Sequence, residues 1–194
     1  MKKGRLEAFS DGVLAIIITI MVLSMKVPKG AGFADLKEVL PAFISYSLSF
    51  TFVGIYWNNH HHFFQALEKV NGKILWANLI LLFFLSLLPF TTEWMGANLL
   101  QKTPIILYGI NHLCCAIAYT IMEKIAITQA GKDSTLAKAL ENKMKEYASA
   151  ALFILAIFLA FYIPQLSLVC YSIVAFIWLI PDKRIEIQLN KNSG

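Results

Sequence analysis

Residues 5–24 read RLEAFSDGVLAIIITIMVLS, and this stretch decides the class of the protein. From Gly12 onward the run is almost wholly apolar, and a helix of this length crosses the roughly 30 Å hydrocarbon core of a bilayer. An ionisable side chain inside such a run is costly unless it meets a partner or water. Asp11 is therefore a candidate member of a functional or structural network of polar side chains. The alternative is that Asp11 lies at the edge of the membrane and its carboxylate extends into the water at the cytoplasmic interface.

The composition of the whole chain also indicates a membrane protein. Of its 194 residues, 58% are hydrophobic and 15% are charged, whereas soluble domains are about 45–50% apolar and about 25% charged. Three cysteines cannot all pair, so a secreted disulfide scaffold is excluded. The net charge of +5 comes from basic residues between apolar runs, which is typical of loops that flank membrane spans and not of a nucleic-acid-binding patch.

Six apolar segments approach or exceed the length of a membrane span, so we expect a single all-α domain of six transmembrane helices over residues 1–194. The predicted spans are about 6–26, 36–64, 74–95, 104–128, 147–163 and 165–181. The last two are short and are separated by a turn around Pro164, which predicts a tight helical hairpin. Pro89 should kink the third span, and segment 132–145 is typical of a loop with a short amphipathic helix.

The distribution of lysine and arginine predicts the orientation. With a cytoplasmic N-terminus, the inside segments hold 13 of the 17 basic residues, and the outside segments hold four, namely Lys26, Lys29, Lys37 and Lys102. Cytoplasmic loops carry an excess of basic residues, and an even number of spans returns the C-terminus to the same side. We therefore expect a multi-pass protein of the cell (inner or plasma) membrane with both termini in the cytoplasm.

The first span carries a stripe of residues on one helical face. Ile16, Thr19, Ile20 and Leu23 recur at spacings of three to four residues. Such a stripe is usual for plain helix packing, and a threonine in a span often bonds only its own backbone. A pore lining is the alternative, and the residue pattern alone leaves both interpretations open.

The second predicted span ends in the polar sequence WNNHHH, residues 57–62. Consecutive residues of a helix point about 100° apart, so three adjacent histidines cannot grip one metal ion, and the His-x-x-x-His spacing of a zinc site is absent. No metal site is expected. We expect instead that His60 or His61 forms hydrogen bonds within the bundle, for which the polar end of the first helix is a possible partner.

Other functional motifs are absent from the sequence or do not fit. Residues 51–56, TFVGIY, partly match the filter of ordinary potassium channels, but they lack the second glycine and lie within a continuous predicted helix that uses up their carbonyl groups. A nucleophile elbow, a phosphate-binding glycine loop and a paired-carboxylate set are all missing. We therefore expect neither an enzyme nor a resident cofactor.

The motifs together resemble those of the transmembrane protein 175 family of potassium channels. Residues 5–16 are similar to the family signature R-x-x-x-F-S-D-x-x-x-A-I. Residues 57–61 and 78–90 resemble the patterns of its second and third helices, and the likeness covers all six spans in order. The family more often has arginine at the position of His62, which leaves the role of that side chain open.

The resemblance implies an assembly and a set of pore residues. One six-helix repeat per chain implies a prokaryotic homotetramer, in which the first helix of each subunit lines a central pore. Ile16 would then form the narrowest hydrophobic ring, Thr19 an ion-coordinating layer, and Ile20 and Leu23 further apolar rings. The residues that anchor this helix at the cytoplasmic side would be Arg5, Phe9, Ser10, Asp11, Trp57, His60 and His61.

We therefore expect a potassium-selective channel that conducts passively, with potassium as the permeant ion and with its own copies and membrane lipid as partners. A ring of aliphatic side chains can gate such a pore by dewetting. A proton-coupled secondary transporter that uses Asp11 and a histidine of the second span is one alternative, although the sequence lacks the internal repeats typical of transporters. A proton leak through the same pore is another.

Overall fold

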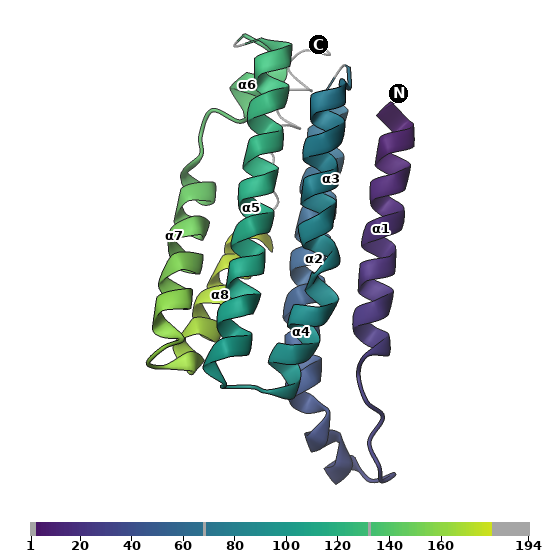
Figure 1. The fold of residues 1–194 in the computed structure, drawn as a ribbon, viewed down its shortest axis with the longest axis vertical. Helices are drawn as coiled ribbons and strands as arrows, with labels where there is room; N and C mark the ends of the chain where they lie inside the picture. The colour runs from purple at the N-terminus through teal and green to yellow at the C-terminus, as the bar shows by residue number, and fades with distance from the viewer. Residues whose placement is uncertain (1–2, 68, 132, 180–194) are drawn as a thin grey trace.

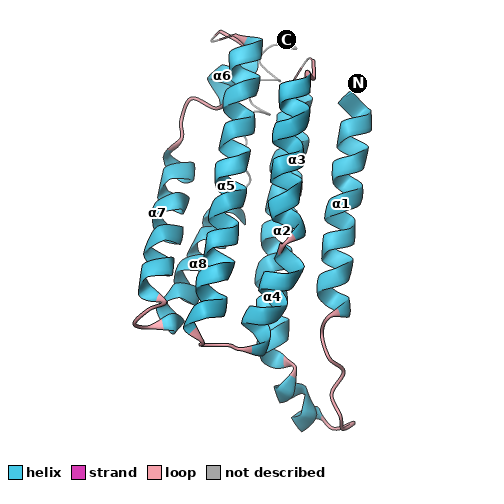
Figure 2. Cartoon of the chain, in the orientation of Figure 1, coloured by secondary structure: helices cyan, strands magenta, loops and turns pink. Residues whose placement is uncertain are grey.

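The computed structural model describes residues 3–67, 69–131 and 133–179, and these ranges form a bundle of helices (Figure 1). The described part of the chain contains no strand (Figure 2). The helices are α1 (Lys3–Leu23), the short 3₁₀ helix η1 (Phe33–Glu38), α2 (Leu40–Ala66), α3 (Gly72–Ser86), α4 (Leu88–Ala97), α5 (Lys102–Ala130), α6 (Thr135–Ala139), α7 (Met144–Leu159) and α8 (Pro164–Leu179).

These helices occupy the predicted apolar segments. Four stretches are long and apolar enough to cross a membrane, namely α1, α2, α3 with α4, and α5. Helix α8 is apolar but shorter, and α7 has 16 residues, so membrane crossing by these two helices stays a prediction. The predicted end of the last span, at residues 180–181, lies outside the described residues, as do Lys2, Lys132 and every basic residue after position 179.

The third predicted span is interrupted, and the predicted kink at Pro89 is confirmed. Helix α3 ends at Ser86 and α4 begins at Leu88, so that Pro89 lies in the first turn of α4. Proline has no amide hydrogen and its ring excludes a carbonyl of the preceding turn, so one continuous ladder of hydrogen bonds cannot pass through the junction. The amide of Leu87 bonds the carbonyl of Phe84 at 3.2 Å instead.

The second helix begins later than its predicted span, at Leu40 and not at residue 36. Pro41 lies in its first turn, where the missing amide hydrogen costs nothing. The residues before it form η1, whose start is held by the Asp35 carboxylate, which accepts the amide of Gly32 at 2.8 Å. Helix α6 is the short helix expected in segment 132–145.

The connections alternate between two ends of the bundle (Figure 1). The start of α1, the α2–α3 connection and α6 lie at one end, which we call the N-terminal end. The α1–α2 connection with η1, the α4–α5 link and the α7–α8 turn lie at the other end. The charge-based topology requires this grouping, because it assigns the first set of segments to one side of the membrane.

Helix α1 lies at the edge of the bundle and is covered on one face only (Figure 1). It contacts α2, α3 and α4. Its buried residues recur at spacings of three and four, as one face of a helix requires, and they are Leu6, Ser10, Leu14, Ile17 and Met21. Val13 and Ile18 are partly covered beside this face, and the opposite face of α1 is exposed in the described part of the chain.

A single glycine allows α5 and α8 to approach each other closely. The Tyr171 hydroxyl on α8 donates to the Ile105 carbonyl on α5 at 2.9 Å. This hydroxyl lies against Gly109, where an added Cβ would overlap it and would also lie 2.9 Å from Cγ1 of Ile157. Position 109 therefore has no space for a larger residue.

We predict that Gly109→Ala destabilises the protein by about 1–3 kcal/mol, the usual cost of overpacking a close contact. Thermal unfolding of the purified protein in detergent measures the effect. Gly54→Ala on α2 is the control, because an added Cβ there meets nothing within 4 Å and alanine favours a helix over glycine. Equal unfolding midpoints for the two variants would contradict the close contact between α5 and α8.

Candidate functional site

A chain of buried hydrogen bonds attaches the N-terminal half of α1 to α3 and α2. Asn78 on α3 donates through Nδ2 to Ser10 Oγ at 3.0 Å, and its Oδ1 lies 2.8 Å from His60 Nε2 on α2. An amide oxygen only accepts, so His60 carries a proton on Nε2 and donates it. Ser10 Oγ then donates to the Leu6 carbonyl at 2.9 Å. We call His60, Asn78 and Ser10 the anchoring chain.

The anchoring chain satisfies polar groups that have no access to water. Ser10 and Asn78 are fully buried, and His60 is 3% exposed. A buried donor or acceptor without a partner costs about 1–3 kcal/mol, and in an apolar bundle these three groups find their partners in one another. The chain therefore fixes which face of α1 is turned toward α2 and α3.

A second, more exposed group lies beside the anchoring chain. Trp57 Nε1 donates to Asp11 Oδ1 at 3.1 Å, and the Trp57 ring stacks on that of His61 with centroids 6.4 Å apart and planes at 19°. His61 Nε2 in turn lies 2.9 Å from Gln65 Nε2, which donates to it. Among the described residues, the hydrogen-bond partner of Asp11 is thus the indole of Trp57 and not a histidine.

The structure brings together five of the seven predicted anchoring residues, in two groups that join α1 to α2 and α3. The other two, Arg5 and Phe9, are exposed. Within the described part of the chain Arg5 makes no hydrogen bond or ion pair, whereas Lys3 donates to the Leu67 carbonyl at 3.3 Å.

Asn78 is the central residue of the anchoring chain, and the predicted anchoring set does not contain it. A signal was present in the sequence, because Asn78 is the one polar residue between Ile74 and Leu85. A polar side chain within a membrane span calls for a partner. The sequence does not say which partner, because Ser10 and His60 lie far from Asn78 along the chain.

Helix α1 has a second attachment nearer its other end. Ser49 Oγ on α2 lies 2.7 Å from Thr92 Oγ1 on α4 and 3.0 Å from the Tyr108 hydroxyl on α5. Thr92 Oγ1 donates to Met21 Sδ on α1 at 3.8 Å. Since each hydroxyl has one hydrogen to donate, the chain runs from Tyr108 through Ser49 and Thr92 to Met21.

The predicted stripe lies on the uncovered face of α1. Ile16 is 59% exposed, Ile20 48% and Leu23 76%, and Thr19 is exposed as well. The Thr19 hydroxyl donates to the Ala15 carbonyl at 2.9 Å, so its hydrogen is used within the helix while its lone pairs stay available. No cluster of metal-ligating side chains occurs among the residues that the structure describes.

Comparison with known proteins shows which family the chain belongs to. Residues 5–89 match the family model described as the endosomal/lysosomal potassium channel TMEM175. A potassium channel of Chryseobacterium sp. (strain P1-3) is 56% identical over 192 residues, which cover 99% of this chain and 100% of that protein. This chain belongs to the TMEM175 family. Its apolar helices are those of a membrane protein.

The likeness extends to solved structures and to animal TMEM175 proteins. The crystal structure of a lysosomal potassium-selective channel TMEM175 homolog from Chamaesiphon minutus matches with a TM-score of 0.78 and 26% identity, over 93% of this chain and 97% of that one. The human endosomal/lysosomal proton channel TMEM175 is 33% identical over 109 residues, which are 50% of this chain but only 22% of the human protein. The match to the Chamaesiphon structure shows that the TMEM175 fold extends over nearly the whole chain.

We predict that Asn78→Ala lowers the free energy of unfolding by about 1–3 kcal/mol, because it leaves His60 and Ser10 buried without their partner. Unfolding in detergent measures the loss. Asn98→Ala is the matched control, since the exposed Asn98 side chain donates only to the Trp94 carbonyl, one turn back along the chain. Adding Ser10→Ala to Asn78→Ala should cost less than the sum of the two single changes. Additive costs would mean that the two side chains do not act as a unit.

Proposed function

We propose that this protein is a potassium-selective channel that conducts passively through a pore lined by α1 from four copies of the chain. The observation that carries the proposal concerns the two faces of α1. One face is attached to the bundle through Ser10 and Met21, and the other face carries the exposed stripe that begins at Ile16. The names of the relatives support potassium as the ion, since three bacterial relatives are potassium channels by name. The tetramer follows from the resemblance described above.

In this arrangement the stripe supplies the pore lining. Four copies of Ile16 form an apolar neck, which is unfavourable for a hydrated cation and can close by dewetting. Thr19 lies three residues further along the helix and presents oxygen lone pairs, because its hydrogen bonds the Ala15 carbonyl. Such oxygens replace part of the hydration shell of a potassium ion. Ile20 and Leu23 form further apolar rings toward the far end.

The two attachments of α1 serve this proposal by fixing the rotation of the helix. Neighbouring residues of a helix point about 100° apart, so a rotation by that angle would bring Ile17 to the neck in place of Ile16. Ile17 is buried against the bundle, at 2% exposure. The anchoring chain at Ser10 and the hydrogen bond from Thr92 to Met21 oppose that rotation from two points along α1.

We further propose that the N-terminal end of the bundle faces the cytoplasm, with six spans in the cell membrane and both chain termini on that side. Lysines gather in the segments at this end, where cytoplasmic loops are expected to be basic. The described ones are Lys3, Lys69, Lys73, Lys124, Lys138, Lys143 and Lys145.

We predict that Ile16→Asn raises potassium flux from reconstituted liposomes on the order of tenfold, as expected when a polar side chain lowers the barrier at the neck by about 1.4 kcal/mol. The ratio of potassium to sodium flux should fall. The assay uses liposomes loaded with either ion and a protonophore that prevents proton coupling. Ile154→Asn on α7 is the control. Ile154 is 58% exposed and Ile16 is 59% exposed, but α7 lies away from α1.

Two outcomes would count against the proposed function. If Ile16→Asn assembles as the wild type does and leaves both fluxes unchanged, the constriction lies elsewhere. If the wild-type protein conducts only when a proton or sodium gradient is applied, it is a coupled transporter and not a passive channel.

A second candidate function is proton permeation through the same pore, because the animal relatives are proton channels by name. Asp11 is an exposed carboxylate of α1, in the half of the helix nearer the N-terminus. A relay directly from Asp11 to a histidine is less well supported, since Asp11 bonds Trp57 and His60 bonds Asn78.

If protons use Asp11, Asp11→Asn should reduce proton uptake into liposomes severalfold while potassium flux persists. Asparagine keeps an Oδ1 acceptor for Trp57, so the contact with α2 is retained. Valinomycin and an outward potassium gradient drive proton entry, a pH-sensitive dye reports it, and protein-free liposomes give the baseline. Glu7→Gln, on the same helix, is the control. Equal proton uptake by both variants would remove Asp11 from the pathway.

A further inference from the structure

Phe9 lies on the exposed face of α1, in line with Ile16. The side chain of Phe9 is 53% exposed and that of Ile16 is 59% exposed. Two turns of an α-helix take about 7.2 residues, so residues seven positions apart lie on nearly the same face and about 10 Å apart along the axis. Phe9 therefore extends the exposed stripe of α1 toward the N-terminal end of the bundle.

The contact that orients Ile16 also orients Phe9. Ser10, the next residue along the chain, is fully buried and accepts a hydrogen bond from Asn78 at 3.0 Å. Leu6, three residues before Phe9, is buried as well. Because neighbouring residues of a helix point about 100° apart, the bond to Ser10 holds the side chain of Phe9 away from the bundle. A rotation that buried Phe9 would break this bond.

Gly12 lies on the exposed face of α1, between Phe9 and Ile16 along the helix. An added Cβ at this position meets nothing within 4 Å, so no neighbour within the described part of the subunit requires a glycine there. Glycine is also a poor residue for the interior of a helix. Its small size leaves the exposed face of α1 narrow at this level, between two large apolar side chains.

We propose that Phe9 forms a second neck of the pore, on the N-terminal side of the neck at Ile16, with a wider stretch at Gly12 between them. The inference rests on the proposed function, because both necks need four copies of α1 around one axis. Four phenyl groups, like four isoleucine side chains, offer a hydrated cation no polar contact. The face of an aromatic ring attracts a cation, so the barrier at Phe9 is the smaller of the two.

Two barriers in series make the effect of one depend on the other. Their resistances add, so the larger neck hides the smaller one. If Ile16→Asn raises potassium flux about tenfold, the neck at Ile16 provides about nine-tenths of the wild-type resistance. Removal of the neck at Phe9 then becomes visible only when the larger neck has been removed. A side chain that acted only by supporting the fold would change the flux by the same factor in both backgrounds.

Potassium flux from reconstituted liposomes tests the proposal in the wild type, Phe9→Asn, Ile16→Asn and the double variant. Phe9→Asn should raise the flux by less than about 1.2-fold alone and by about twofold or more in the Ile16→Asn background, since only there does the smaller barrier limit the flux. Phe9→Leu keeps an apolar ring at this level and should leave the flux of Ile16→Asn within about 1.5-fold.

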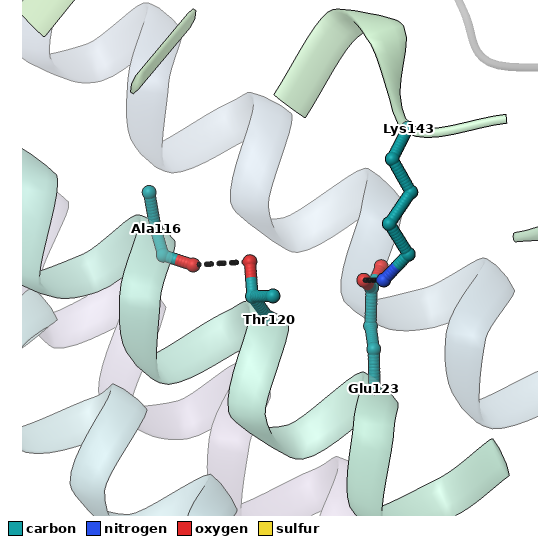
Figure 3. Close-up of polar contacts among 4 residues, drawn as sticks. All are labelled: Ala116, Thr120, Glu123 and Lys143. Carbon is teal, nitrogen blue, oxygen red and sulfur yellow. Dashed lines mark hydrogen bonds and ion pairs between the residues drawn. The ribbon is translucent and has the colours of Figure 1, made fainter. Parts of the chain in front are cut away.

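The matched control is Phe176→Asn on α8, because Phe176 is 68% exposed and α8 lies on the far side of the bundle from α1 (Figure 1). That side of the bundle has contacts of its own. Lys143 Nζ, before α7, lies 3.6 Å from Glu123 Oε2 on α5 (Figure 3), and a cavity of about 360 Å³ lies between α2, α5, α7 and α8. Phe176→Asn should leave the flux unchanged in both backgrounds.

The possible results separate this inference from the proposed function. The second neck is overturned if Phe9→Asn has no effect in the Ile16→Asn background, changes the flux by the same factor in both backgrounds, or lowers it. Size-exclusion chromatography adds one more test, because loss of assembly in Phe9→Asn but not in Phe176→Asn would make Phe9 a packing residue. In each of these cases the neck at Ile16 still stands. If Ile16→Asn itself leaves the flux unchanged, the proposed neck and this inference both fail.

Discussion

The arrangement of the molecule depends on one constraint, namely that polar side chains inside an apolar bundle must find partners there. His60, Asn78 and Ser10 come from three different helices and satisfy one another in a single directed chain. That chain holds α1 at the edge of the bundle with one face inward. The orientation of the other face, on which the proposed pore depends, is a consequence of this pairing and not of apolar packing alone.

The break between α3 and α4 separates the two attachments of α1. Asn78 lies on α3 and Thr92 lies on α4, on either side of Leu87. Each half of the broken helix therefore holds its own end of α1, through an amide in one case and a hydroxyl in the other. A bend at the junction would change the relation between the two attachments without breaking either of them.

The sequence predicts the helices well, because apolar length and proline position are local properties. The run after Asp11 predicts α1, and Pro89 predicts the break in the third span. The pattern of α1 alone could not separate a packed stripe from an uncovered one, since Ile16 and Ile17 are equally apolar. The difference is that Ile17 is 2% exposed and Ile16 59%, which follows from the pairing of Ser10 with a residue far along the chain. The cavity was also beyond prediction, because four helices from separate parts of the sequence form its wall.

The short α7–α8 hairpin has a consequence for the surrounding lipid. Each of these helices has 16 residues, and at a rise of about 1.5 Å per residue such a helix is about 24 Å long. The hydrocarbon core is roughly 30 Å thick, so a hairpin that crosses it thins the bilayer locally or draws its turn inward. The turn is suited to that position, because Phe161 and Tyr162 are exposed there, at 58% and 71%, and aromatic side chains favour the headgroup boundary. The protein would then be shorter beside this hairpin than beside α2 and η1, and the membrane around it would be uneven in thickness.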